Sequence, residues 1–234
     1  MIAVTFALSE ESSEFLRRLR DKSHADRNGI TTIRGKIGDR EVEVLHTGVG
    51  ERVCRQRLGK FLENQQFDFL ISSGFAGALN DKMQVGDLLL AKNFSTVDLT
   101  EKRSFVSSLP IHTADLLTVP ALIESRDERI KLERESGAVA VDMETEFIAR
   151  ACAAHGVPLL SLRIISDTPR NLFPAPPRVL FDIAKQRTDF VKIGTFFLTH
   201  PNRVPALFQF VSSITRVRKT LAKALDEVVG NIET

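Results

Sequence analysis

The sequence has few of the features that mark secreted or membrane proteins. Only two cysteines occur, and both lie in stretches with helical periodicity, which favours packed, reduced thiols over a disulfide framework or a zinc site: Cys54 and Cys152. No run approaches the roughly 18 apolar residues of a membrane span. The apolar start, residues 1–8, lacks the basic leader and small-residue cleavage site of a signal peptide. We therefore expect a cytoplasmic protein.

An excess of charge of one sign is also missing. The 32 basic residues are nearly matched by 30 acidic ones, which leaves a formal net charge of +2 and no overall field for nucleic acid. The chain has 234 residues, 43% of them hydrophobic and 26% charged, which suits one globular domain. Because no repeat or linker divides the sequence, we expect a single domain over 1–234 with a helical tail at 200–229.

Strand-like and helix-like segments alternate along the chain. Short β-rich runs predict strands at 2–8, 41–48, 67–72 and 159–166. Apolar residues three and four positions apart predict helices at 11–22, 51–65 and 144–156. The run 159–166 is nearly continuous in apolar residues, as a central strand covered on both faces is. The alternation predicts an α/β fold.

Small and polar residues follow four of these strands, in the segments 9–12, 47–50, 73–79 and 166–170. Ligands of α/β sheets bind at such strand ends. Glycines there allow close approach of the backbone and expose N–H groups; they are Gly48, Gly50, Gly74 and Gly77. Each is alternatively an ordinary turn glycine.

Two acidic residues flank the pair formed by the third helix and the last strand. Glu144 falls in the first helical turn, and Asp167 follows the strand. A helix folded back on the sheet can bring both carboxylates to one rim. Taken singly, a first-turn acid also satisfies the helix dipole, and Asp167 also suits a turn before Pro169.

Three segments in order resemble the superfamily of purine nucleoside phosphorylases and methylthioadenosine/S-adenosylhomocysteine nucleosidases. They are "ISSGFAGALNDKMQVGDLLLA" (71–91), "AVDMETEFIARAC" (140–152) and "VPLLSLRIISD" (157–167). The resemblance implies a three-layer α/β/α sandwich with a central mixed sheet, and a homo-oligomer. It also implies cleavage of a purine nucleoside at its N-glycosidic bond by water or phosphate. We expect no metal and no cofactor.

The resemblance also implies roles for individual residues. Asp167 matches the acid that protonates N7 of the leaving purine, which requires a pKa raised by burial. Glu144 matches a permanently charged carboxylate that holds the ribose 2′ and 3′ hydroxyls, and Met143 matches a residue packed against the ribose. The segment formed by Gly74, Phe75, Ala76 and Gly77 would border the base or the nucleophile.

The sequence departs from the family pattern at the positions that bind the attacking nucleophile, either water or phosphate. The first-loop glutamate that positions water in the nucleosidases aligns with Ser12, and we expect Glu11 to replace it. Phe75 stands where phosphorylases carry a phosphate-binding hydroxyl, and Ser72 stands where an arginine is expected; Arg52 could supply another cation. Hydrolysis and phosphorolysis therefore both stay open. The alternative to an enzyme is a homologue without catalytic activity that binds nucleosides or has a structural role.

The last third of the chain carries an amphipathic pattern with a basic face. Its apolar stripe comprises Val204, Leu207, Phe208, Val211, Ile214, Val217, Leu221 and Leu225. This tail resembles that of hopanoid-associated phosphorylases, which implies a nucleoside joined to a large apolar lipid. The 5′ side of the pocket would then be apolar, with Phe173 in its lining, and the basic face could contact a membrane surface. A terminal helix packed on its own domain is the competing interpretation.

Overall fold

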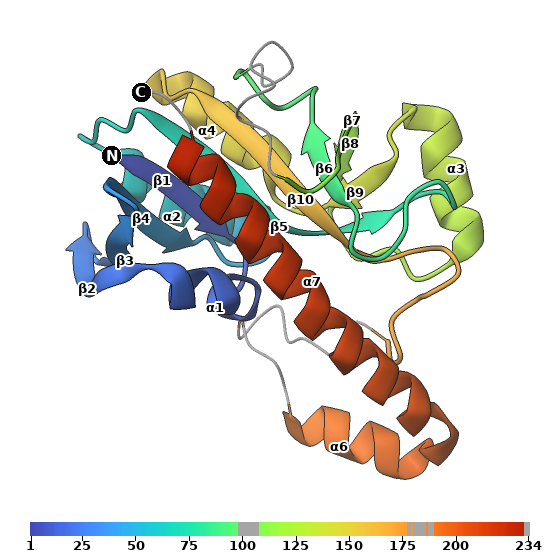
Figure 1. The fold of residues 1–234 in the computed structure, drawn as a ribbon. Coiled ribbons are helices and arrows are strands. Elements are labelled where there is room, and N and C mark those ends of the chain that lie inside the picture. Colours follow the sequence, from blue (N-terminus) through green and yellow to red (C-terminus); the bar gives the residue numbers. More distant parts are fainter. Residues whose placement is uncertain (98–107, 177–178, 180–185, 187–189, 232–234) are drawn as a thin grey trace.

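A mixed β-sheet forms the centre of the protein (Figure 1). The computed structural model describes residues 1–97, 108–176, 179, 186 and 190–231. In chain order the strands are β1 (Ile2–Phe6), β2 (Arg20–Arg27), β3 (Ile30–Ile37), β4 (Arg40–His46), β5 (Phe69–Ala78), β6 (Leu88–Ala91), β7 (Ile111–Ala114), β8 (Leu116–Thr118), β9 (Ala140–Asp142) and β10 (Leu159–Asp167).

The strand order is β2-β3-β4-β1-β5-β10-β6-β7, with β9 paired to β5 and β8 paired to β9. Strand β1 runs parallel to β4 and β5, and β5 runs parallel to β10. The hairpins β2–β3 and β3–β4 and the pair β6–β10 are antiparallel. The carboxyl ends of β1, β4, β5 and β10 consequently meet at one edge of the sheet, where α/β proteins bind ligands.

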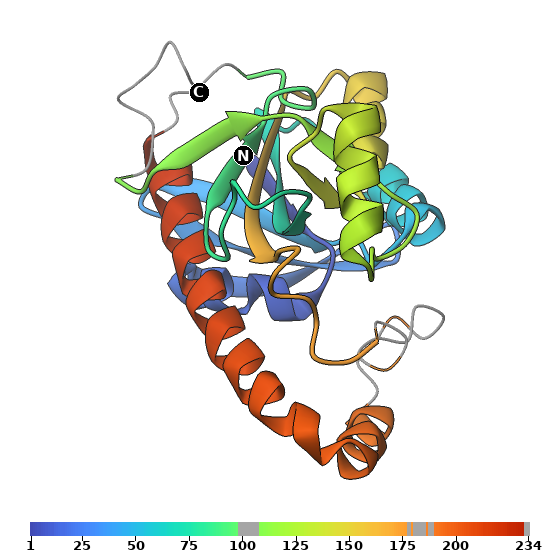
Figure 2. The ribbon, with the colours of Figure 1, turned by 90° about the vertical axis from the view of Figure 1, so that its right-hand side faces the viewer.

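Helices cover both faces of this sheet. The described helices are α1 (Ser9–Arg18), α2 (Glu51–Leu62), α3 (Arg126–Ser136), α4 (Thr145–His155), α6 (Phe190–Thr199), which extends away from the sheet (Figure 2), and α7 (Val204–Asn231), with a 3₁₀ turn at Pro201–Arg203. Helices α1 and α7 pack on one face, and α2 and α4 pack on the other. The three-layer α/β/α sandwich with a mixed sheet is therefore confirmed.

The alternation of side chains along β1 and β5 shows why these strands are apolar throughout. Val4 and Ile71 point into the layer of α1 and α7, while Ala3 and Leu70 point into the layer of α2 and α4. Each strand is buried on both sides, so its sequence lacks the polar alternation of a half-exposed strand. Each apolar side chain of this size that is fully buried contributes about 1.5–3 kcal/mol.

Two segments differ from the sequence prediction. The polar stretch 20–37 forms the hairpin β2–β3, and every residue of Arg20–His24 is exposed, because β2 lies at the edge of the sheet. The segment 73–79, predicted as a glycine turn after a strand, continues β5 as far as Ala78. Residues 98–107 lie outside the described part of the chain.

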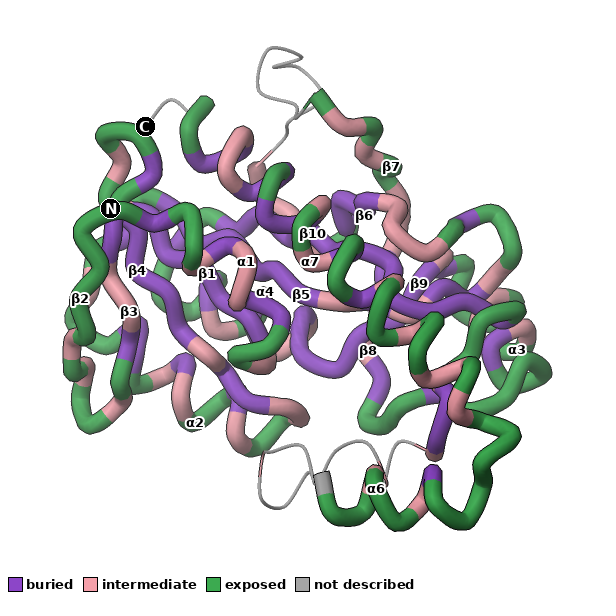
Figure 3. The backbone as a smooth tube through the Cα atoms, turned by 60° about the horizontal axis from the view of Figure 1, so that its bottom comes forward, coloured by how far each residue is buried: buried purple, intermediate pink, exposed green. Residues whose placement is uncertain are grey.

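Helix α7 divides into two parts along its length. In its carboxyl-terminal part Val217, Leu221 and Leu225 are buried against α1 and the sheet. In its amino-terminal part Phe208 is 70% exposed and Val211 is 54% exposed. Figure 2 shows that this part and α6 extend away from the body, and α6 is largely exposed in Figure 3. The apolar stripe predicted from the sequence is thus buried only from Ile214 onward.

No helix in the described part of the chain is both long enough and apolar enough to cross a bilayer.

Candidate active site

The Glu11 carboxylate lies in a pocket of backbone N–H groups formed by the residues after β1 and by Phe75 of β5. Its Oε2 accepts hydrogen bonds from the N–H groups of Ala7 (3.0 Å) and Leu8 (3.1 Å), and its Oε1 accepts one from Phe75 (3.1 Å). The side chain is buried. Burial raises the pKa of Glu11, and the three N–H groups and Arg163 oppose that rise.

Ser12 lies apart from this pocket. Its hydroxyl is 2.8 Å from Nε2 of His46 and donates to the carbonyl of Ser9. The structure therefore places Glu11, and not the neighbouring Ser12, against the glycine segment of β5.

Gly74 allows Glu11 and Arg163 to approach the backbone of β5. Its φ angle is +147°, a conformation that residues with a side chain rarely adopt. A Cβ atom at this position would lie 2.9 Å from Nη1 of Arg163 and 3.1 Å from Oε2 of Glu11. A larger residue would therefore displace one of the two charged groups.

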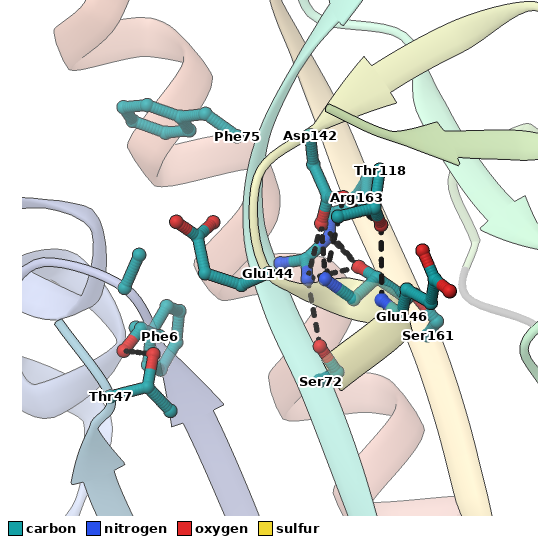
Figure 4. Close-up of polar contacts among 12 residues, drawn as sticks. Phe6, Thr47, Ser72, Phe75, Thr118, Asp142, Glu144, Glu146, Ser161 and Arg163 are labelled. Carbon is teal, nitrogen blue, oxygen red and sulfur yellow. Dashed lines mark hydrogen bonds and ion pairs between the residues drawn. The ribbon is translucent and has the colours of Figure 1, made fainter. Parts of the chain in front are cut away.

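Arg163 organises a buried polar cluster beneath the pocket (Figure 4). Its Nη2 donates to the hydroxyls of Ser72 (2.7 Å) and Thr145 (2.6 Å) and lies 3.0 Å from Oδ2 of Asp142. Thr118 also donates to Asp142, at 2.8 Å. Ser72, which stands where an arginine was expected, thus accepts a hydrogen bond from the guanidinium of Arg163 on the neighbouring strand β10.

Sequence reasoning did not select Arg163. The signal was a charged residue inside the apolar run 159–166, because a charge in a strand buried on both faces requires a partner.

Glu144 immediately precedes α4 but makes no side-chain hydrogen bond to that helix end, and its side chain extends away from the Arg163 cluster (Figure 4). Its Oε1 accepts a hydrogen bond from the N–H group of Gly50 at 3.0 Å. Burial and then the nearby Asp142 raise the pKa of Glu144 to about 8. The raised pKa favours the protonated form, whereas the resemblance implies a permanently charged carboxylate.

Asp167 ends β10 and forms a buried ion pair with Arg129 of α3. Its Oδ1 also accepts a hydrogen bond from Ser166 Oγ at 2.7 Å. Burial raises the pKa of Asp167, and Arg129 and Ser166 oppose that rise. Sequence reasoning missed Arg129, because a helix with several charged residues does not reveal which of them points inward.

Gly77 provides the space in which this pair meets β5. A Cβ atom there would lie 3.0 Å from Oδ2 of Asp167 and 3.1 Å from Nη1 of Arg129. The preceding Ala76 is buried, and its carbonyl accepts a hydrogen bond from Ser166 Oγ. Gly74 thus lies beside Glu11 and Arg163, whereas Gly77, three residues later on the same strand, lies beside Asp167 and Arg129.

The other predicted residues surround this edge. Met143 is buried in an apolar cluster that includes Leu79 and Val49. Gly48, with a φ of +78°, precedes Val49, whose N–H group donates to Oε1 of Gln186 at 2.7 Å. The loop 47–50 is therefore held between Glu144 on one side and Gln186 on the other.

Phe173 lines a separate cavity of about 410 Å³ beyond Asp167. The walls come from the segment after β10, from the loop before α3 and from α6 and the turn that follows it. The lining residues are Ile123, Glu124, Leu172, Phe173, Pro174, Ala175, Pro176, Phe196, His200 and Arg203. The ring of Phe173 also contacts the ring of Phe210 edge to face, at 5.6 Å between centroids.

In the described residues no group of three or more His, Cys, Asp or Glu side chains could hold a metal ion. Both cysteines are buried, and burial raises the pKa of Cys54 and of Cys152 to about 12. These thiols therefore stay protonated at neutral pH, and neither is suited to act as a nucleophile.

Comparison with known proteins agrees with this architecture. The model of the phosphorylase superfamily matches residues 1–115 and 97–189. A 5′-methylthioadenosine/S-adenosylhomocysteine nucleosidase of Staphylococcus haemolyticus is 24% identical over 196 residues, which cover 71% of this chain and 86% of the relative. A nucleosidase of the same name from Staphylococcus aureus is 26% identical over the same shares.

Solved structures of similar proteins share the fold over almost the whole chain. The nucleosidase of S. pneumoniae, with a transition-state inhibitor, superposes with a TM-score of 0.72 at 18% identity, covering 99% of both chains. A futalosine hydrolase mutant of Helicobacter pylori gives a TM-score of 0.71 at 17% identity and the same coverage. The chain belongs to the phosphorylase superfamily.

Proposed function

We propose that this protein hydrolyses the N-glycosidic bond of a purine nucleoside, with Glu11 as the base that activates water. The observation that carries the proposal is the set of three backbone N–H groups that bind the Glu11 carboxylate. The relatives named as nucleosidases and the futalosine hydrolase support this class of reaction.

The position of Glu11 favours water over phosphate as the nucleophile. Backbone N–H groups beside glycine form anion sites, but here a carboxylate of the chain itself already occupies them. A phosphate dianion would also be repelled by this carboxylate and by Asp142 nearby. Arg163 offers little compensation, because it already binds Asp142, Ser72 and Thr145. A carboxylate with a raised pKa is instead suited to take a proton from water.

Glu11 and Asp167 lie at two different positions along β5. Gly74 borders Glu11, and Gly77 borders Asp167. Separate carboxyl groups are thus available for the attacking water and for the leaving base. We assign Glu11 to the water, Asp167 to the leaving base, and Glu144 to the ribose hydroxyls.

The test is release of free base from adenosine, methylthioadenosine and inosine, each with and without phosphate. Hydrolysis predicts equal base release in both conditions and free ribose or its 5′ derivative as the other product. Base release only with phosphate would make the protein a phosphorylase. No release from any of the three nucleosides, combined with measurable binding of adenine, would support the catalytically silent alternative.

We further propose that the substrate carries a large apolar 5′ group, as a lipid-linked adenosine does. The support is the cavity beside Phe173 and the exposed apolar residues that continue from it along α6 and α7, among them Val191, Leu198 and Phe208. Each methylene group of such a substrate that is buried there would contribute about 0.8 kcal/mol. Contact with a membrane surface would place the enzyme beside such a substrate.

Truncation cannot test this proposal, because the carboxyl-terminal part of α7 belongs to the core. We instead propose the paired substitutions Phe208→Ser and Val211→Ser, which leave the core intact. Co-sedimentation with anionic vesicles should decrease in this variant, while hydrolysis of methylthioadenosine in solution should not change. Equal activity on 5′-alkyl and 5′-hydroxyl nucleosides would contradict the proposal of an apolar 5′ group.

We also propose that the protein is a homo-oligomer and is cytoplasmic, as its resemblance to the superfamily implies for the first and its sequence for the second.

A further inference from the structure

The peptide group between Val49 and Gly50 is bound at both of its ends. Its N–H group donates to Oε1 of Glu144 at 3.0 Å, and its carbonyl accepts from Nε2 of Gln186 at 3.0 Å. This peptide group is trans, so it is planar and its carbonyl and N–H group point in opposite directions. A hydrogen bond that fixes the carbonyl therefore also fixes the direction of the N–H group.

Gln186 makes a second hydrogen bond to the same residue. Its Oε1 accepts from the N–H group of Val49 at 2.7 Å, so the side-chain amide binds both backbone polar groups of Val49. The φ angle of Gln186 is +51°, a conformation that residues with a side chain adopt rarely and only where their contacts hold them there. Both observations indicate that Gln186 is held in one position against the loop 47–50.

The loop needs such a contact because glycines flank Val49. Gly48 has a φ of +78°, and Gly50 has a φ of +86°. Glycine adopts positive and negative φ angles about equally well, so the peptide group before Gly50 can rotate. A rotated peptide group would turn its carbonyl oxygen toward Glu144 and repel the carboxylate. The N–H group, in contrast, opposes the rise of the Glu144 pKa, because it favours the ionised form.

We propose that Gln186 is a positioning residue, which holds the N–H group of Gly50 toward Glu144 and so keeps that carboxylate in place for the ribose hydroxyls. This inference rests on the proposed function, in which Glu144 binds these hydroxyls. Gln186 acts through one peptide group and needs no contact with the substrate. The preference for ribosides over 2′-deoxyribosides should therefore depend on Gln186.

The variant Gln186→Leu tests this role through selectivity for the sugar. Leucine has no group that could bind the backbone of Val49, so both hydrogen bonds are lost. Release of adenine from adenosine and from 2′-deoxyadenosine is measured at pH 8. We expect the ratio of the two kcat/KM values to fall about fivefold, the equivalent of one hydrogen bond.

The pH dependence of kcat/KM supplies a second measurement. In Gln186→Leu the ascending limb that Glu144 causes should move to higher pH, because the carboxyl loses a donor that favours its ionised form. Other titratable groups that face Glu144 are unchanged in this variant; they include Asp142, Glu11, Arg163 and Cys54. A loss of stability alone would lower activity without moving this limb.

A double variant and a matched control complete the experiment. If Gln186 acts through Glu144, adding Gln186→Leu to Glu144→Gln should change the selectivity ratio little further. Asn93→Leu is the control, because the amide of Asn93 binds the carbonyl (2.9 Å) and the N–H group (3.0 Å) of Leu116 in the same way. Its substitution removes an equivalent pair of hydrogen bonds and should leave the selectivity ratio and the ascending limb unchanged.

An unchanged selectivity ratio in Gln186→Leu would overturn the proposal, as would an equal fall in Asn93→Leu. Should Gln186→Leu fail to fold, Gln186→Glu gives the same decision: at pH 8 it keeps the acceptor for the N–H group of Val49 and loses the donor to its carbonyl. The absence of any base release by the unmodified protein is a different result, which would remove the proposed function and this inference with it.

Discussion

The two ends of the site on β5 hold their acids in different ways. At Gly74, Glu11 is surrounded by main-chain N–H groups, whereas at Gly77, Asp167 is paired with the side-chain cation of Arg129. Burial raises the pKa of both carboxyls. The N–H groups oppose that rise at Glu11, and the cation of Arg129 opposes it at Asp167. The comparison shows two carboxyls of raised pKa, one held by the main chain and one held by a side chain from a different helix.

The largest effect should come from removing the base at the first end. Glu11→Gln keeps the shape of the side chain, but the amide cannot take a proton from water. General base catalysis contributes on the order of 100- to 10,000-fold, so we expect kcat to fall at least 1,000-fold. Adenine binding, measured by calorimetry, should persist. A variant that keeps a tenth of the activity would show that Glu11 is not the base.

Asp167→Asn tests the second end and should have a smaller effect on catalysis. The amide cannot pass a proton to the leaving base, and general acid catalysis contributes on the order of 100- to 10,000-fold, so we expect kcat/KM to fall about 100-fold. Stability should also decrease, by about 3–5 kcal/mol, because a buried charge loses its counter-ion.

The control for the stability part is Asp226→Asn, which breaks the partly exposed pair between Arg18 and Asp226. Urea denaturation of this variant should show a loss below about 1 kcal/mol. Equal losses in the two variants would mean that burial does not distinguish the Asp167 pair.

Glu144 lies beside the loop that follows β4, where its carboxyl accepts a hydrogen bond from the N–H group of Gly50. Its pKa of about 8 predicts that kcat/KM rises with pH up to about 8, as the carboxylate that binds the ribose forms. Glu144→Gln should lower kcat/KM about tenfold and remove the part of this rise that Glu144 causes.

The raised pKa of Glu144 also predicts how the stability of the folded protein changes with pH. The folded protein binds this proton more tightly than the unfolded chain, so the contribution of Glu144 is full below the unfolded pKa of about 4.5 and is lost as pH rises through about 8. Urea midpoints measured from pH 5 to 9 should therefore decline less in Glu144→Gln than in the unmodified protein. Parallel declines would place the Glu144 pKa outside this interval.

The smallest effect should come from Ser12→Ala. Ser12 is next to Glu11 in the chain, but its hydroxyl bonds to His46 and Ser9. We expect turnover within threefold of the unmodified protein and a stability loss of about 1 kcal/mol, the usual net value of one hydrogen bond. A loss of turnover as large as that of Glu11→Gln would assign the water to this side of α1.

The sequence predicted the parts of this molecule that local patterns specify. Continuous apolar runs identified the buried strands, and three motifs indicated where Glu144, Asp167 and the glycine segment lie. The partners of these residues come from distant parts of the chain. Arg129 is one of several charged residues on α3, and only the packing of α3 against the end of β10 brings it to Asp167.

The edge hairpin was missed for a different reason. Strand β2 exposes nearly all of its side chains, so its sequence carries no apolar alternation. Its partner β3 and the sheet behind it supply the order that local composition does not. The continuation of β5 through Gly74 and Gly77 was also missed. These glycines do not end the strand; they allow charged side chains to lie close to its backbone.

The packing of α1 against α7 has a consequence for how the chain folds. Arg18 and Asp226 lie 3.0 Å apart although 208 positions separate them, and Val217 and Leu225 share one core with Phe6 and Phe15. Closing so long a loop is entropically costly and slows folding. During synthesis the face of the sheet that α7 covers must stay open until α7 has left the ribosome. Until then the nascent chain should expose an apolar surface, which is where a chaperone would bind.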